Sequence, residues 1–153
     1  MMDKNDKRFL FNVKLNWIGD TIGLLSSTST SEELSVAAPA EFGGTEKLWT
    51  PEHFFLNAIS SCFMTTFLAL SKKMGFEILD FNCEAVGQIE IVEGRYKFTH
   101  IDLYPKVYID NENLHEKAEK AMEKTHKYCI IANSVNVEVT YHSRVLIGTE
   151  RTQ

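Results

Sequence analysis

The sequence predicts an α+β fold in which largely antiparallel sheets pack around one long, buried central helix. Two observations lead to this prediction. Apolar and polar residues alternate in four separate stretches, which is typical of strands that place one face on a core. A run from Phe54 to Ser71 contains no charged residue, although 24% of the chain is charged. A run of this kind indicates a helix that other parts of the molecule enclose.

The four alternating stretches define four strands, each with one inward row. The rows are Phe9, Phe11, Val13, Leu15 and Trp17; Phe81, Cys83, Ala85, Ile89 and Ile91; Ile101, Leu103, Val107 and Ile109; and Val135, Val137, Val139 and Tyr141. Gly94 and Arg95 should turn a hairpin between the second and third strands. Pro105 lacks a ladder donor, which predicts an edge position or a bulge. Shorter strands are expected at 23–27 and 33–37, followed by a loop over 39–50.

Two helices complete the predicted fold. Thr50, Pro51 and Glu52 form a favourable helix start, with a hydroxyl cap, a proline at the first position and an acid in the first turn. The central helix should extend to about Met74 and stop at Gly75. A second helix is expected over 112–128, with one apolar stripe made by Leu114, Ala118, Ala121, Met122 and Thr125.

Length and composition favour one domain over 1–153, with flexible tails at 1–7 and 147–153. The net charge of -5 and the scattered acidic residues leave no basic stripe for nucleic acid. The amino end is charged and is not followed by an apolar secretory segment, so we expect a cytoplasmic protein. The uncharged run meets the lower length limit for a membrane span, but its six polar residues argue against membrane insertion.

Cys62 lies in the middle of the uncharged run and is the main candidate for chemistry. Burial raises the pKa of a thiol, so Cys62 is either inert core filling or a nucleophile activated by a neighbouring cation or hydrogen-bond donor. Three cysteines are too few for a secreted disulfide framework. Cys129 follows the second helix, whereas Cys83 belongs to an inward strand row and is expected to be structural. The pair His126 and Cys129 alone does not make a metal site.

The chain resembles the OsmC/Ohr family of osmotically inducible and organic hydroperoxide resistance proteins. The resemblance covers about residues 9 to 145 and rests on motifs in a fixed order. These are Pro51-Glu52, then Ser61-Cys62-Phe63, the LYPKVYI strand, the second helix, and His126-Lys127-Tyr128-Cys129 before an asparagine-serine pair and a final strand.

This resemblance implies an interlocked homodimer with the central helices between sheets and the reactive thiols at the interface. It also implies a thiol-dependent peroxidase with a role in oxidative stress defence. Cys62 would attack an organic hydroperoxide, Cys129 would resolve the product, and Glu52 would orient a basic residue near the thiolate. The family uses no bound cofactor or metal, and an external dithiol such as dihydrolipoamide reduces it. Apolar residues such as Phe54, Phe55 and Phe63 would line the substrate site.

The sequence departs from the family at one point. The peroxidase branch carries an arginine on an amino-terminal loop, whereas this chain has no arginine between Arg8 and Arg95. Activation of Cys62 would then require another basic group, with Lys47, His53, Arg95 and Arg144 as the candidates. A non-catalytic dimer that binds a small hydrophobic ligand at its interface is the main alternative function. Hydrolysis through a thioester on Cys62 lacks an identifiable histidine partner.

Overall fold

The computed structural model describes residues 7–148, which form two compact units. The first unit ends at Phe54 and the second begins at Phe55, within the first turn of the longest helix. Each unit is described by itself below. The expected tails at 1–7 and 147–153 lie largely outside the described residues, although Ile147 is the last residue of a strand. One domain over 1–153 stays a prediction.

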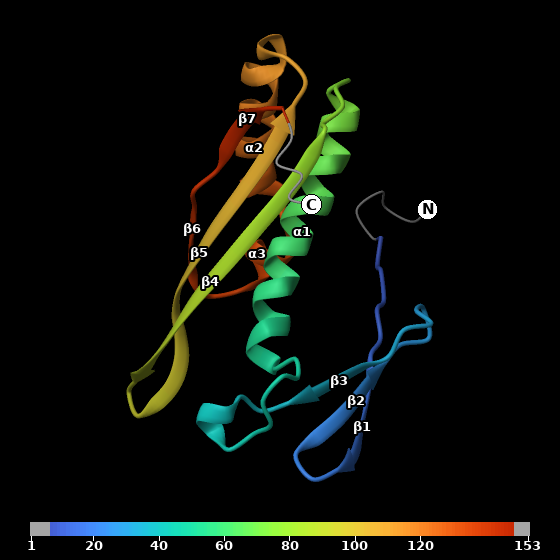
Figure 1. Cartoon of the computed structure of the whole chain (residues 1–153), viewed down its shortest axis with the longest axis vertical. Coiled ribbons are helices and arrows are strands. Elements are labelled where there is room, and N and C mark those ends of the chain that lie inside the picture. Colours follow the sequence, from blue (N-terminus) through green and yellow to red (C-terminus); the bar gives the residue numbers. More distant parts are fainter. Residues whose placement is uncertain (1–6, 149–153) are drawn as a thin grey trace. The chain divides into compact units, whose positions relative to one another are not determined.

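The first unit is an antiparallel sheet with the order β1-β2-β3 (Figure 1). Its strands are β1 (Lys14–Gly19), β2 (Ile22–Ser26) and β3 (Leu34–Ala37), and a short 3-10 helix, η1 (Ala40–Phe42), follows them. The two shorter strands therefore match the prediction closely. The expected inward row of the first strand is wrong for the isolated chain, because Phe11 is 93% and Trp17 is 76% exposed. Phe9, Phe11 and Val13 also precede the strand.

The second unit contains a four-stranded sheet with the order β4-β5-β6, with β7 also on β5. The long hairpin of β4 (Asp80–Val92) and β5 (Arg95–Ile109) runs alongside the central helix α1 (Figure 1). The hairpin turns at Glu93 and Gly94, which both have positive φ values. The inward rows of both strands are confirmed except at Ile91, which is 63% exposed near the turn.

The last two strands pair with β5 in parallel, in contrast to the antiparallel pairing elsewhere. β6 (Glu138–Tyr141) pairs with 100–103, and β7 (Arg144–Ile147) pairs with 106–109. Pro105 lies between these two segments, so its missing N–H coincides with the change of partner. The predicted edge position or bulge at Pro105 is therefore wrong: the proline is inside a strand that has partners on both sides.

The central helix α1 (Pro51–Lys73) forms as its terminal residues predict. The Thr50 hydroxyl accepts a hydrogen bond from the His53 N–H at 3.2 Å, and Gly75 follows the helix with φ of 74°. Its buried residues recur every fourth position, at Ile59, Phe63, Phe67 and Ser71. The helix is thus buried along one stripe in the isolated chain, not enclosed on all sides. By length and composition α1 could also cross a membrane, a test that core helices of soluble proteins pass too.

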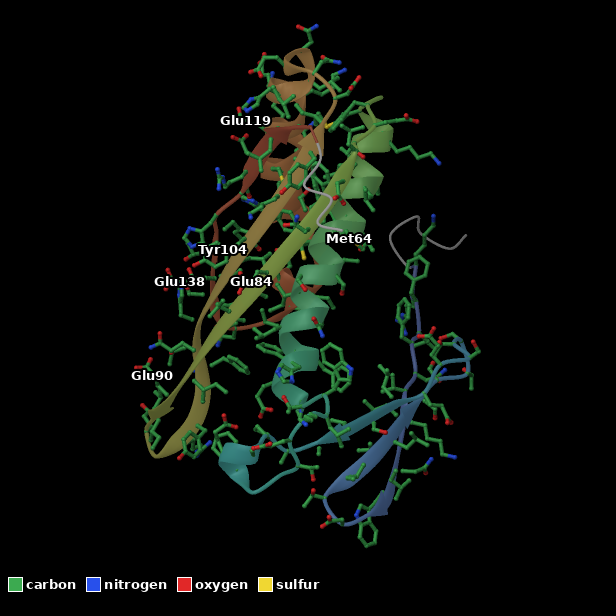
Figure 2. The ribbon with its side chains drawn as sticks, in the orientation of Figure 1. Met64, Glu84, Glu90, Tyr104, Glu119 and Glu138 are labelled. Atoms are coloured by element: carbon green, nitrogen blue, oxygen red, sulfur yellow. The ribbon has the colours of Figure 1, made fainter. Side chains whose placement is uncertain are left out.

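The core of the second unit lies between α1, β5 and the second helix. The second helix forms as η2 (Glu112–Leu114) followed by α2 (His115–Tyr128), and a short helix α3 (Ile130–Ser134) comes after it. The expected stripe is confirmed, since Ala118, Ala121, Met122 and Thr125 are buried and Leu114 is partly buried against the core. Ala118, Ala121 and Met122 pack with Ile59, Phe63 and Phe67 of α1 and with Ile101, Leu103, Val107 and Ile109 of β5. Glu84 and Tyr104, which are opposite each other in the register, lie on the exposed face of the hairpin (Figure 2).

Candidate functional site

Cys62 borders the buried stripe of α1. It precedes the fully buried Phe63 by one residue and follows Ile59 by three, so its side chain is half-buried rather than enclosed. Its sulfur lies 3.9 Å from the hydroxyl of Thr66, one helical turn further on. Helical spacing therefore places a second polar group beside the thiol within the same helix.

Cys129 is fully buried at the junction between α2 and α3. Its N–H donates to the Thr125 carbonyl at 3.0 Å, and its carbonyl accepts from the Asn133 N–H at 3.0 Å. The Cys129 side chain is close enough to Cys62 for each thiol to shift the pKa of the other. Two thiols that are far apart in the sequence are therefore neighbours in the structure; we call them the thiol pair.

The environment of Cys62 favours its thiolate. Burial acts to raise the pKa of Cys62, but four hydrogen-bond donors hold the pKa below the ordinary value of 9.0. In decreasing order of effect these are the backbone N–H of Ile131, the Cys129 thiol, the Thr66 hydroxyl and the backbone N–H of Ile130. A donor that bonds to the charged form lowers an acid's pKa. The two N–H groups are available because the first turn of α3 has no earlier carbonyls to bond them.

The environment of Cys129, in contrast, disfavours its thiolate. Burial raises the pKa of Cys129 to about 11, and the hydrogen bond and negative charge of Cys62 contribute to the rise. The thiol pair therefore consists of one thiol whose ionisation is favoured and one that stays protonated. Cys83 is separate from the pair on β4, and burial raises its pKa to about 11 as well.

Three rings pack beside the thiol pair, and we call them the aromatic stack: Phe63, His126 and Tyr141. The rings of His126 and Tyr141 are parallel within 14° with centroids 4.0 Å apart, and the Phe63 centroid is 5.6 Å from each. His126 is half-buried, which lowers its pKa, and its Nε2 lies 3.2 Å from the Ser143 hydroxyl. Although His126 lies in the last turn of α2, its ring stacks on Tyr141 of β6.

Tyr141 is the site residue that sequence reasoning missed. Burial raises its pKa, and the charges of Cys129 and Cys62 add to the rise. Negative charge on either sulfur therefore acts on the Tyr141 hydroxyl. In the sequence, Tyr141 is one apolar position of a strand row. Only the pairing of Tyr141 with Leu103 of β5 places it in the aromatic stack. Phe63, expected to line a substrate site, is fully buried in the core and cannot do so.

None of the donors that act on Cys62 within the described residues is a cation. Of the basic residues considered from the sequence, Arg95 begins β5 at the hairpin and Arg144 begins β7, and neither acts on the sulfur. Lys47 and His53 belong to the other unit. Glu52 also lies there, in the first turn of α1, and its Oε2 is buried without a hydrogen-bond partner among the described residues.

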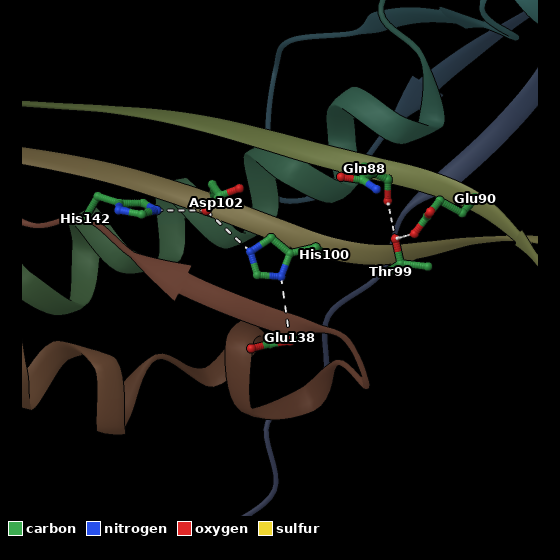
Figure 3. Close-up of polar contacts among 7 residues, drawn as sticks. All are labelled: Gln88, Glu90, Thr99, His100, Asp102, Glu138 and His142. Carbon is green, nitrogen blue, oxygen red and sulfur yellow. Dashed lines mark hydrogen bonds and ion pairs between the residues drawn. The ribbon is translucent and has the colours of Figure 1, made fainter.

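A polar network on the exposed face of β5 holds β6 in place (Figure 3). One oxygen of Asp102 lies 2.7 Å from His142 Nε2 and 3.3 Å from His100 Nε2, and the other ring nitrogen of His100 is 3.8 Å from Glu138. The hydrogen bond from His142 lowers the pKa of Asp102, and His100 adds to this effect. Both histidines are partly exposed and contact a carboxylate. Within residues 7–148, no group of three such side chains has the spacing of a metal site.

The first unit contains an apolar groove of about 550 Å³. It is lined mainly by side chains of the sheet and of the residues around it, including Val13, Leu15, Leu34, Val36 and Phe54. A groove of this size and lining suits an apolar molecule or side chain.

The order of the two cysteines and the fold around them agree with one family of known proteins. The family model for OsmC-like protein matches residues 44–142. The chain belongs to this family. The model match includes both members of the thiol pair, Glu52 and Tyr141.

Individual relatives of this OsmC-like protein are distant in sequence. The uncharacterized protein YmaD of Bacillus subtilis is 25% identical over 145 residues, covering 92% of this chain and 97% of its own. An OsmC-like protein of unknown function from Vibrio cholerae has a TM-score of 0.77 at 21% identity, over 92% of this chain and 100% of that one. An organic hydroperoxide resistance protein from Elizabethkingia anophelis has a TM-score of 0.72 at 21% identity, over 94% and 99%. These structures share the α+β fold of this chain.

Proposed function

We propose that this OsmC-like protein is a thiol-dependent peroxidase that reduces organic hydroperoxides to alcohols. The observation that carries the proposal is the proximity of Cys62 and Cys129, with the pKa of Cys62 lowered and that of Cys129 raised. A peroxidase of this type needs one ionised nucleophile and one reserve thiol within bonding reach. Family membership and the names of similar structures support the choice of organic hydroperoxides.

The first step uses the Cys62 thiolate. It attacks the outer oxygen of the hydroperoxide, the O–O bond breaks, and the electron pair of that bond leaves with the inner oxygen as an alkoxide, which takes up a proton to become the alcohol. Cys62 is thereby oxidised to a sulfenic acid. The N–H groups of Ile130 and Ile131 hold the thiolate before this step.

The second step uses Cys129, whose pKa of about 11 keeps it protonated while Cys62 is a thiolate. Oxidation of Cys62 removes the negative charge that contributes to this high pKa, so Cys129 ionises more readily afterwards. Its sulfur then attacks the Cys62 sulfur and releases water, which leaves a disulfide. An external dithiol, such as a lipoyl group, would reduce this disulfide by exchange in two steps.

The proposal includes the setting that the family resemblance implies: a cytoplasmic homodimer in oxidative stress defence. Glu52 would orient a basic group that assists Cys62. The buried, unpartnered Oε2 of Glu52 supports this role, since a buried carboxylate oxygen is costly without a donor.

The test compares four forms of the protein: wild type, Cys62→Ser, Cys129→Ser and the control Cys83→Ser. Each is mixed with cumene hydroperoxide or hydrogen peroxide, and consumption of a lipoyl-type dithiol is followed. Wild type and Cys83→Ser should turn over cumene hydroperoxide faster than hydrogen peroxide, and Cys62→Ser should be inactive. Cys129→Ser should stop turning over at the sulfenic acid, and excess peroxide should then oxidise Cys62 further to the sulfinic acid, a gain of two oxygens by mass spectrometry. Equal, slow consumption by wild type and Cys62→Ser would refute the enzyme function.

The groove of the first unit favours one alternative, a non-catalytic dimer that binds a small hydrophobic ligand. A groove lined by Val13, Leu15 and Leu34 suits such a ligand. Binding of a fluorescent fatty acid by both wild type and the Cys62→Ser variant would support this function instead, provided that wild type consumes no peroxide.

A further inference from the structure

Tyr141 packs its ring on Phe63, the residue after Cys62, and on His126, three residues before Cys129, and the steps above give it no role. Two sets of contacts fix its position. The aromatic stack holds its ring against His126 and Phe63. On the opposite face of the sheet, Glu138 and His142, which lie on either side of it in the chain, contact His100 and Asp102 of β5 (Figure 3).

The Tyr141 hydroxyl is available as a donor. It makes no hydrogen bond to another residue in the described part of the chain, and Tyr141 is only half-buried, so its hydroxyl can reach solvent or a small molecule. Burial raises its pKa, and negative charge on Cys129 and Cys62 adds to the rise. The hydroxyl therefore keeps its proton at neutral pH.

The chemistry of the first step calls for such a donor. An alkoxide is a strong base and leaves slowly unless a proton reaches it as the O–O bond breaks. A positioned acid contributes roughly 10²- to 10⁴-fold to steps of this kind. The amide N–H groups of Ile130 and Ile131 can stabilise charge but do not release protons. His126 is kept neutral by burial, which lowers its pKa, and its Nε2 is engaged with Ser143.

We propose that the Tyr141 hydroxyl donates the proton to the alcohol that leaves when Cys62 is oxidised. This inference rests on the proposed peroxidase function and names one more catalytic residue for it. The Cys62 thiolate takes the outer oxygen with its hydrogen, the inner oxygen takes the proton of Tyr141, and the resulting tyrosinate recovers a proton from water. The net products are the sulfenic acid and the alcohol.

The test uses the leaving group as its probe. Tyr141→Phe and the matched control Tyr104→Phe, an exposed tyrosine on the other face of β5, are compared with wild type. Single-turnover rates of Cys62 oxidation are measured with cumene hydroperoxide, which releases an alkoxide, and with peroxybenzoic acid, which releases a carboxylate that needs no proton. Iodoacetamide labelling of Cys62 at neutral pH reports separately whether the thiolate is intact.

Tyr141→Phe should be slowed about ten- to a hundredfold with cumene hydroperoxide and little with the peroxyacid, as expected for the loss of a general acid. Tyr104→Phe should match wild type with both. Unchanged rates, or equal losses with both oxidants, would overturn the role of Tyr141, since a merely structural change slows both reactions alike. Wild type that reacts with neither oxidant at Cys62 would instead overturn the peroxidase function itself.

Discussion

At the scale of single residues, the two thiols of the pair differ because their neighbours differ. Both are partly or fully removed from water, which penalises the thiolate. Cys62 also receives two backbone N–H groups and two side-chain donors, whereas Cys129 faces the negative charge of Cys62. Donors therefore outweigh burial at Cys62, and burial prevails at Cys129.

This difference predicts the order of alkylation. At pH 8 a thiol with a pKa of about 11, as at Cys129 and Cys83, is ionised in roughly one molecule in a thousand. Cys62, with a pKa below 9.0, has the largest thiolate fraction at this pH. Iodoacetamide followed by peptide mass spectrometry from pH 6 to pH 10 should label Cys62 first, and the other two cysteines only in the alkaline range.

Urea-unfolded protein is the control for this experiment, because all three cysteines should then label at similar rates. Faster labelling of Cys83 than of Cys62 in the folded protein would contradict the assignment of the nucleophile.

Sequence reasoning identified both cysteines of the pair through a family resemblance, but it could not identify the activating group. Composition alone is equally compatible with Cys62 as core filling. The donors Ile130 and Ile131 carry apolar side chains, and their contribution comes from backbone N–H groups of a short helix that has no sequence signal. A search for a cationic side chain therefore could not find them.

At the scale of elements, local signals predicted the helices and most strands well. The cap at Thr50 and the stop at Gly75 are properties of neighbouring residues, and so is the alternation along β4 and β5. The parallel pairing of β6 and β7 was missed because strand direction depends on the path of the helices between them. The short strand β7 was missed because its four residues are too few for a clear alternation.

The packing of the hairpin on α1 predicts a strong effect at Gly87. A Cβ atom there would lie 2.6 Å from Cε1 of Phe98 and 2.9 Å from Cδ2 of Leu56. Gly87→Ala should therefore destabilise the protein by about 1–3 kcal/mol, the usual cost of overpacking. Urea unfolding measures this loss. Gln88→Ala, at the adjacent exposed position of β4, should change the midpoint little, and equal effects of the two substitutions would contradict the close packing.

At the scale of the whole molecule, the isolated chain exposes many large apolar side chains. Those of the first unit include Phe9, Leu10, Phe11, Leu15 and Trp17, and α1 is buried along only one stripe. Exposed apolar surface of this kind marks interaction sites. In the homodimer that we propose, the partner chain would cover this row, which the sequence predicted to face a core.

The dimer proposal predicts a mass of about twice the 17.5 kDa of one chain in light scattering coupled to size-exclusion chromatography. Trp17→Glu should shift the protein toward the monomer, because a charge would replace a large exposed ring. Asn16→Glu, at the neighbouring position of β1 with its side chain on the opposite face, should leave the mass unchanged. A wild-type protein with the mass of one chain would contradict the dimer.

The donors that hold the Cys62 thiolate within one chain are neutral groups, and this has a consequence for its behaviour in salt. Dissolved ions screen the attraction between two exposed charges over about 8–10 Å, but they act much less on short contacts with partly buried amide groups. The reactivity contributed by Ile130 and Ile131 should hence persist as ionic strength rises. A decline in the reactivity of Cys62 in concentrated salt would therefore report the part of that reactivity that a charged group contributes.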